Sequence, residues 1–215
     1  MARQMVRGVG SLKVWLALAI TALASVATAN AACRIAVLGD SLTTAYGLAL
    51  EDGFPAQLQR GLRAAGYACE VLDAGVAGDT SAGGLARLEW ALADEPTHVI
   101  VELGGNDALR ALPPEQMEAN LDAIVSRLDA EGLPVLLAGM LAPPNLGRRY
   151  GDAFAAVFPR VAERYEVPLY PFFLDGVAGR VELNQPDGIH PTAQGIAIIV
   201  ERILPTVTGW LERSG

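Results

Sequence analysis

Only two histidines occur in the 215-residue chain, and their positions restrict the acid-base chemistry available to it. His98 opens the apolar segment 98–103, which is typical of a buried strand, so we interpret it as a structural residue. His190 lies instead in a glycine-containing segment, three residues after Asp187. One turn can hold both side chains, so that the carboxylate orients the imidazole and stabilises its cation. A loop acid beside a helix-capping histidine is the alternative interpretation.

Ser41 is the nucleophile that such a histidine would activate. It lies in the sequence Gly39-Asp40-Ser41-Leu42, directly after the apolar segment 34–38. A serine hydroxyl is a weak nucleophile and needs a base within hydrogen-bonding reach. We therefore predict a catalytic triad of Ser41, His190 and Asp187.

Three further groups could stabilise the negative charge that such a reaction develops on a carbonyl oxygen. The backbone N–H groups of Ser41 and Gly78 and the side-chain amide of Asn106 each follow a different apolar segment. Together they predict an oxyanion hole. Glycine, aspartate and serine are also ordinary turn residues, so each segment taken alone is more typical of an ordinary loop.

The elements that would position these groups alternate from residue 34 onward. Apolar runs rich in Val, Ile and Leu predict strands at 34–38, 70–73, 98–103, 134–140 and 167–170. Helical patterns lie at 54–65, 81–92, 114–130, 153–165 and 192–211, and Pro205 is expected to bend or interrupt the last. Continuous rather than alternating hydrophobicity indicates a parallel sheet covered on both faces, hence a three-layer α/β/α sandwich. Ligands bind outside the carboxyl ends of such strands, where Ser41, Gly78 and Asn106 fall.

The first 31 residues differ from the rest and match a secretory signal peptide. Arg3, Arg7 and Lys13 give a positive start, an uncharged apolar run spans 14–26, and small residues follow, with cleavage expected near 29–31. An uncleaved anchor and a lipoprotein attached through Cys33 are the alternatives. We expect a periplasmic or secreted protein with a single domain over 32–215 and no stable membrane span after cleavage, because the apolar run is shorter than a span needs.

Removal of the signal changes the charge of the protein and the chemistry open to it. Thirteen arginines then face 24 acidic residues, so the net charge falls from −8 to −11, and no lysine remains. A chain without lysine cannot perform Schiff-base or Ser-Lys chemistry or form a P-loop. The acidic balance also argues against nucleic acid as a partner.

Both cysteines remain in the mature chain. Cys33 precedes the first predicted strand and Cys69 opens the second. If these strands are neighbours in parallel, as in flavodoxin-like order, the two thiols lie at the same edge of the sheet. A disulfide and a pair of free, buried thiols both remain open, because bond geometry cannot be derived from sequence.

Four ordered segments together resemble the SGNH hydrolases, also called GDSL esterases and lipases. They are Gly39-Asp40-Ser41-Leu42, Gly78, Gly104-Gly105-Asn106-Asp107 and Asp187-Gly188-Ile189-His190-Pro191. The similarity covers nearly the whole mature chain and is greatest to the exported bacterial branch of thioesterase I, lysophospholipase L1 and arylesterase. It implies a five-stranded parallel sheet, hydrolysis of small acyl esters and thioesters through an acyl-enzyme, and no metal or organic cofactor. It also implies the same triad and oxyanion hole.

The acyl group is less well defined by the sequence. Leu109, Leu146 and Phe173 are candidates for lining an acyl groove or, alternatively, for covering the core, and residues 141–149 are expected to form a mobile loop. We expect a monomer. A carbohydrate acetylesterase of the same fold and a non-catalytic envelope binding protein remain alternatives, whereas a nucleotide-binding module is disfavoured because there is no G-x-G-x-x-G sequence.

Overall fold

The computed structural model describes Met1 and residues 32–214, and residues 32–214 lie within one compact unit. The predicted signal peptide, Met1 apart, and its cleavage site lie outside the described residues.

A five-stranded sheet of parallel strands forms the centre of the unit, in the order β2-β1-β3-β4-β5. The strands are β1 (Arg34–Gly39), β2 (Glu70–Gly75), β3 (His98–Glu102), β4 (Val135–Ala138) and β5 (Leu169–Tyr170). The predicted parallel sheet and its flavodoxin-like order are confirmed. The three central strands are buried almost throughout, which explains their continuous rather than alternating hydrophobicity.

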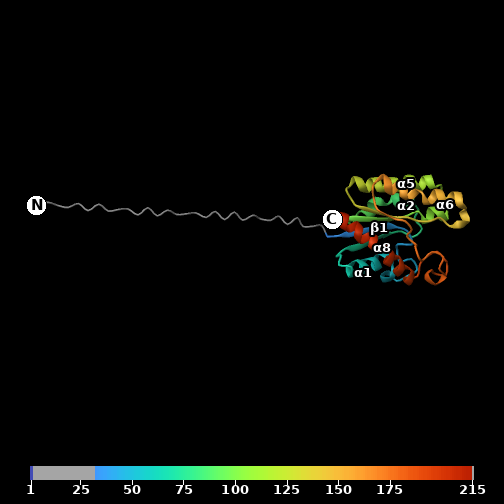
Figure 1. The fold of residues 1–215 in the computed structure, drawn as a ribbon, viewed down its shortest axis with the longest axis horizontal. Coiled ribbons are helices and arrows are strands. Elements are labelled where there is room, and N and C mark those ends of the chain that lie inside the picture. The colour runs from blue at the N-terminus through green and yellow to red at the C-terminus, as the bar shows by residue number, and fades with distance from the viewer. Residues whose placement is uncertain (2–31, 215) are drawn as a thin grey trace. The chain divides into compact units, whose positions relative to one another are not determined.

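Helices cover both faces of this sheet and make the expected three layers. Figure 1 shows α1 and α8 on one side of β1, and α2, α5 and α6 on the other. The helices are α1 (Phe54–Ala64), α2 (Ser81–Ala86), α3 (Leu88–Ala91), α4 (Gly105–Leu109), α5 (Pro114–Ala130), α6 (Arg148–Ala155), α7 (Val157–Arg164) and α8 (Ala193–Ser214). Because every strand runs in the same direction, their carboxyl ends all open on one edge of the sheet.

Two of the predicted helices are in fact broken. The stretch predicted at 81–92 divides into α2 and α3 at Arg87, whose guanidinium is bound by groups outside both helices. The stretch predicted at 153–165 begins earlier, at Arg148, and divides at Ala156. Pro159 explains the second break, because it has no N–H to donate to the carbonyl of Ala155.

Other local predictions also need correction. Residues 141–149, expected to form a mobile loop, include a 3-10 turn at Pro144–Leu146 and the start of α6. Helix α4 was not predicted at all. Pro205 does not interrupt α8, which continues to Ser214. The carbonyl that Pro205 leaves without a donor belongs to Glu201, and both residues lie on the exposed side of the helix, where water can bond it.

A disulfide joins Cys33 and Cys69 immediately before β1 and β2. The backbone of the two strands is paired beside it, since the N–H of Glu70 donates to the carbonyl of Cys33. The bridge therefore lies at the amino ends of the strands, opposite the edge where Ser41 lies. It closes a loop of 36 residues.

Replacing both cysteines with alanine is expected to lower the free energy of unfolding by about 3–4 kcal/mol, because the open chain regains loop entropy when it unfolds. Activity in the folded state should be unchanged, since the site is at the other end of the strands. Urea titration of the two proteins, with ester hydrolysis measured in parallel, checks both parts. Equal stability, or an intact mass that does not change on reduction of the wild type, would contradict the expectation.

Candidate active site

Ser41, His190 and Asp187 are brought together from positions almost 150 residues apart. Ser41 Oγ lies 2.9 Å from His190 Nε2, and His190 Nδ1 lies 2.7 Å from Asp187 Oδ2. A carboxylate can only accept, so Nδ1 carries the proton and Nε2 is free to accept one from the serine hydroxyl. The imidazole is thus held in the tautomer that a general base requires.

The loop before α8 orients the Asp187 carboxylate. Its Oδ1 accepts the backbone N–H groups of Ile189 at 2.9 Å and His190 at 3.0 Å, while Oδ2 faces the imidazole. These hydrogen bonds, the backbone one from His190 foremost, lower the pKa of Asp187 to about 2. The carboxylate therefore remains ionised over the whole range in which an imidazole titrates.

Ser41 lies on a tight turn at the carboxyl end of β1. The carbonyl of Asp40 accepts the N–H groups of Thr43 and Thr44, and the Asp40 carboxylate accepts the N–H of Leu42 at 2.9 Å. Gly39 permits this turn, because a Cβ there would lie only 2.2 Å from the Thr43 hydroxyl. Its absence lets the chain reverse closely enough to present the serine at the edge of the sheet.

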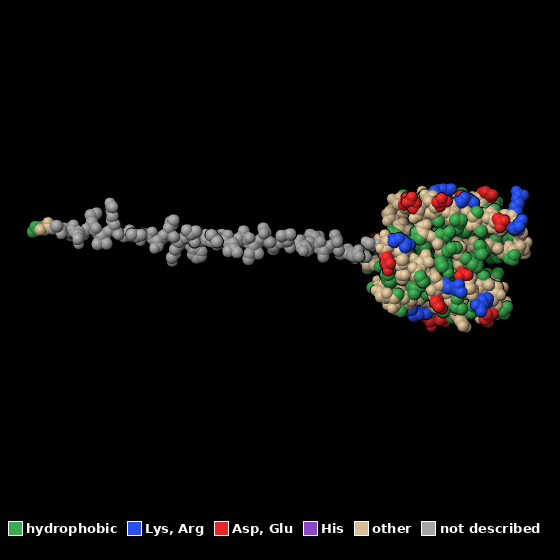
Figure 2. Space-filling model, in the orientation of Figure 1, with side chains coloured by type: hydrophobic (Ala, Val, Ile, Leu, Met, Phe, Trp, Pro, Cys, Tyr) green, Lys and Arg blue, Asp and Glu red, His purple; other side chains and the backbone are tan. Residues whose placement is uncertain are grey.

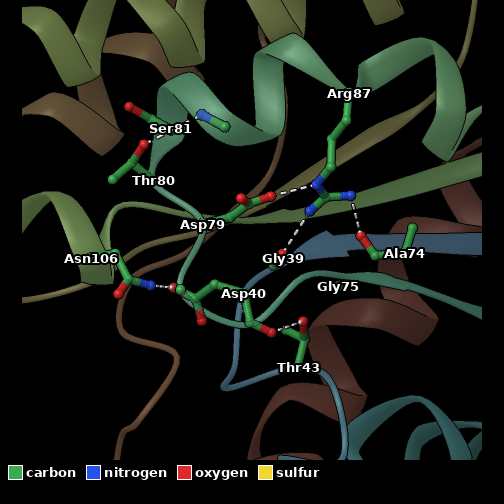
Figure 3. Close-up of polar contacts among 12 residues, drawn as sticks. Gly39, Asp40, Thr43, Ala74, Gly75, Asp79, Thr80, Ser81, Arg87 and Asn106 are labelled. Carbon is green, nitrogen blue, oxygen red and sulfur yellow. Dashed lines mark hydrogen bonds and ion pairs between the residues drawn. The ribbon is translucent and has the colours of Figure 1, made fainter.

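Asn106 is anchored to the same turn from the neighbouring strand. It follows β3 in α4, and its Nδ2 donates to Asp40 Oδ2 at 2.9 Å (Figure 3). An amide nitrogen has two protons, so one remains for a substrate oxygen. Gly104 directly precedes this helix with a φ of 114°, and a Cβ there would lie 2.8 Å from the sulfur of Met117. Only glycine therefore lets β3 turn so tightly into the helix that carries Asn106.

Asp40 is a buried acid whose charge the fold maintains. Burial raises its pKa to about 6, and the N–H of Leu42 and the amide of Asn106 oppose that rise. At neutral pH the carboxylate is therefore ionised and accepts from Asn106. The neighbouring Glu102 is fully buried, and its carboxyl oxygens have no hydrogen-bond partner. Burial, with Asp40 adding to it, raises the pKa of Glu102 well above its usual range, which favours the neutral form of this second acid.

A cavity of about 400 Å³ opens in front of these groups. Ser41, Gly78, Asn106 and His190 all line it, so the structure brings the candidate nucleophile, base and oxyanion donors to one space. Most of its remaining wall is apolar and includes Leu42, Leu109, Met140, Leu141, Leu174 and Ile189. On the face shown in Figure 2, hydrophobic side chains gather in the middle, and the charged side chains lie mostly toward the margins.

Of the three residues predicted to line an acyl groove, Leu109 does so and is about half exposed at the mouth. Phe173 does not, because it is fully buried and packs edge-on against Phe54 with ring centres 5.0 Å apart. Leu146 lies in the 3-10 turn outside the lining. Met140 and Leu174, which were not predicted, do line the cavity. Apolar character was the signal for all of these residues, and it does not distinguish a cavity wall from the core.

Several contacts at the site involve residues that are not among the predicted site residues. The ring of Tyr46 lies 4.3 Å from that of His190, centre to centre. Arg110 donates to the carbonyl of Gly78 at 2.7 Å. Asp107 accepts both the N–H and the hydroxyl of Ser81, which ties the end of the Gly78 loop to α4. The only available signal was their position within or next to the four ordered segments.

His98 lies at the amino end of β3, on the opposite edge of the sheet. Its ring contacts the hydroxyls of Thr97 at 2.8 Å and Ser214 at 3.2 Å and packs edge-on against Trp210. Burial lowers its pKa, which favours the neutral ring. These contacts agree with the structural role expected for it.

In the part of the chain that the structure describes, no group of histidine, cysteine and acidic side chains could hold a metal ion. Within the same residues, no helix is long and apolar enough to cross a membrane.

Comparison with known proteins identifies relatives over most of the chain. Esterase TesA of Pseudomonas aeruginosa is 46% identical over 178 residues, which cover 82% of this chain and 89% of the relative. Thioesterase 1/protease 1/lysophospholipase L1 of Escherichia coli K12 is 39% identical over 174 residues, 80% of this chain and 82% of the relative. The crystal structure of the psychrotrophic esterase EstA from Pseudoalteromonas, inhibited by monoethylphosphonate, superimposes with a TM-score of 0.79 at 36% identity, covering 83% of this chain and 98% of that one.

The sheet order, the layers and these relatives define the SGNH hydrolase fold. The chain belongs to the GDSL-like lipase/acylhydrolase family, whose model matches residues 37–198.

Proposed function

We propose that the protein is a serine esterase that hydrolyses carboxylic ester and thioester bonds of small acyl substrates, with Ser41, His190 and Asp187 as its catalytic triad. The observation that carries the proposal is the pair of contacts at His190, 2.9 Å to Ser41 Oγ and 2.7 Å to Asp187 Oδ2. The names of the relatives, an esterase and a thioesterase/lysophospholipase, support the reaction class.

Acylation begins when Ser41 Oγ attacks the carbonyl carbon and His190 Nε2 takes the hydroxyl proton. The carbonyl oxygen becomes an oxyanion, which the N–H groups of Ser41 and Gly78 and the amide of Asn106 stabilise. As the tetrahedral intermediate collapses, His190 returns the proton to the leaving alcohol or thiol. The acyl group is then an ester of Ser41.

Deacylation repeats the same steps with water in place of the serine hydroxyl. His190 takes a proton from the water, which attacks the acyl carbon, and then returns a proton to Ser41 Oγ as the acid departs. Asp187 stabilises the imidazolium in both halves and does not itself become protonated. No step in this sequence uses a group from outside the chain other than water.

The apolar wall of the cavity favours an acyl chain over a sugar. An acetylated sugar would place many hydroxyls against Leu42, Met140 and Leu174, which offer no hydrogen-bond partners. A chain of methylene groups gains about 0.8 kcal/mol for each group buried. Lysophospholipids and other short- to medium-chain esters therefore fit the cavity better than acetylated polysaccharides.

Export is part of the proposal. The N-terminal pattern of charge, apolar run and small residues supports secretion, and the Cys33–Cys69 bridge suits an oxidising compartment. Cytosolic acyl-CoA would then not be the natural substrate, and thioester hydrolysis would be a capability of the site.

A chain-length profile tests the substrate class. On nitrophenyl esters, kcat/KM is expected to rise from acetyl to medium chains as more methylene groups enter the cavity, and acetylated xylo-oligosaccharides are expected to be poor substrates. Preference for the acetylated sugars would instead establish the carbohydrate acetylesterase. Hydrolysis of none of these compounds would favour the non-catalytic envelope binding protein.

Replacing Asn106 with alanine is expected to lower kcat by about 10²–10³, because one oxyanion donor is lost while the substrate cavity stays intact. KM should change little, since the donor acts mainly on the charged transition state. Steady-state kinetics on one nitrophenyl ester checks both numbers. An unchanged kcat would remove Asn106 from the oxyanion hole.

A further inference from the structure

Arg87 lies at the break between α2 and α3 and points out of both helices toward the sheet (Figure 3). Its Nη1 donates to the carbonyl of Ala74 at 2.6 Å and its Nη2 to the carbonyl of Gly39 at 2.8 Å. Its Nε forms an ion pair with Asp79. The guanidinium is thus bound on three sides, and only 15% of the side chain is exposed.

The three acceptors share one property: each is next to a segment that carries a candidate oxyanion donor. Gly39 ends β1 and leads directly to the Asp40–Ser41 turn. Ala74 lies near the end of β2, at the start of the loop that carries Gly78, and Asp79 directly follows Gly78. One planar group therefore connects the segment of the Ser41 N–H with the segment of the Gly78 N–H.

The fold provides a specific place for the Asp79 carboxylate. A Cβ at Gly83 would lie 2.6 Å from Asp79 Oδ1, so glycine leaves the room that the carboxylate occupies. On the other side of the loop, Asp107 accepts the N–H and the hydroxyl of Ser81 at 2.8 and 2.6 Å. The Gly78 loop is consequently held between Arg87, toward β1, and α4, which carries Asn106.

The Arg87–Asp79 ion pair adds little to the stability of the fold, because the cost of removing two charges from water offsets much of their attraction. A guanidinium has a different advantage in that its N–H groups have fixed relative directions, so it can set the spacing of several acceptors at once. Oxyanion donors need such control, since their effect depends on placement within about 0.5 Å.

We propose that Arg87 is a positioning residue of the oxyanion hole, which fixes the Gly78 loop relative to the Ser41 turn through Asp79, Gly39 and Ala74. The inference rests on the proposed esterase function. Arg87 lies outside the cavity lining and acts on the reaction only through the two backbone N–H groups whose segments it joins.

The structure offers a matched control at the opposite end of the same strands. Arg34 opens β1, pairs with Glu70 at the start of β2 at a distance of 3.0 Å, and donates to the backbone carbonyl of Asp94. Arg34→Ala thus removes a guanidinium that binds an acid and a carbonyl, but far from the Ser41 turn. Any general effect of losing such a group on folding should occur in both variants.

Arg87→Ala is expected to lower kcat by about tenfold to a hundredfold, less than the loss of a donor itself, because the donors are displaced and not removed. KM should change by less than about twofold, since the oxyanion exists only in the transition state. The kcat of Arg87→Lys should lie between those of the wild type and Arg87→Ala, because an ammonium retains the charge but not the fixed directions of the guanidinium N–H groups. Arg34→Ala should keep the wild-type kcat.

Rescue provides the readout that a structural role alone would not change. Millimolar guanidinium chloride, far below denaturing concentrations, should restore part of the kcat of Arg87→Ala and none of that of Asn106→Ala. Equal losses in Arg87→Ala and Arg34→Ala, or a raised KM at an unchanged kcat, would overturn the inference. If Arg87→Ala does not fold, the kcat and KM of Arg87→Lys decide the question by the same criteria. A wild type without esterase activity would contradict the proposed function instead.

Discussion

Ser41→Ala is expected to reduce kcat for ester hydrolysis by about 10⁶-fold, the size of loss that follows removal of the nucleophile from a serine hydrolase triad. Ser41 Oγ lies 2.9 Å from His190 Nε2. Among the contacts that the structure describes, no other side chain bonds to this nitrogen and could replace the lost hydroxyl. The fold should be unaffected, because the turn at Asp40 is held by backbone and carboxylate bonds that do not include the Ser41 hydroxyl. Steady-state kinetics measures the loss.

Two measurements make this result decisive. Circular dichroism and urea titration should give the wild-type spectrum and free energy of unfolding, so that the loss belongs to chemistry and not to folding. Retention of more than about 1% of the wild-type kcat by a purified, folded Ser41→Ala protein would exceed any residual rate of a disabled triad and would reject Ser41 as the nucleophile.

His190→Ala is expected to cost about the same factor, because the serine hydroxyl is not activated without its base. The two groups act as one unit, so the double variant Ser41→Ala/His190→Ala should be no slower than either single variant. Kinetics on all three proteins tests this non-additivity. His98→Gln is the matched control: it alters the other imidazole of the chain, at the far edge of the sheet, and should leave kcat at the wild-type value.

Losses that add in the double variant would show that Ser41 and His190 contribute separately, which contradicts a triad. A large loss of kcat in a folded His98→Gln protein would likewise contradict the assignment of the base to His190.

The sheet and the meeting point of the site could be predicted because both depend on repeated local signals. Continuous apolar runs identified all five strands, and parallel strands necessarily place their carboxyl ends on one edge. Ser41, Gly78 and Asn106 follow three such strands, and His190 was the single imidazole not assigned to a strand. The small number of histidines was therefore as informative as the hydrophobic pattern of this chain.

The remaining features depend on contacts between distant segments, which leave no periodic trace. At the break between α2 and α3 the Arg87 guanidinium binds the carbonyl of Gly39 and the carboxylate of Asp79, contacts that no local pattern reveals. Phe173 is apolar, as expected of a groove residue, but it packs against Phe54 in the core. Pro159 is a local signal for the break before α7, since proline removes a helical hydrogen bond.

Labelling with a serine-directed phosphonate tests the central claim most directly, because the reagent bonds only to an activated hydroxyl and mimics the tetrahedral intermediate. The EstA relative was crystallised in a form inhibited by monoethylphosphonate. We expect one phosphonyl group on the wild type, located by peptide mass spectrometry on Ser41, with activity lost in proportion to labelling, and no label on Ser41→Ala. Labelling of Ser41→Ala at the wild-type rate, or full activity in a completely labelled protein, would contradict the account.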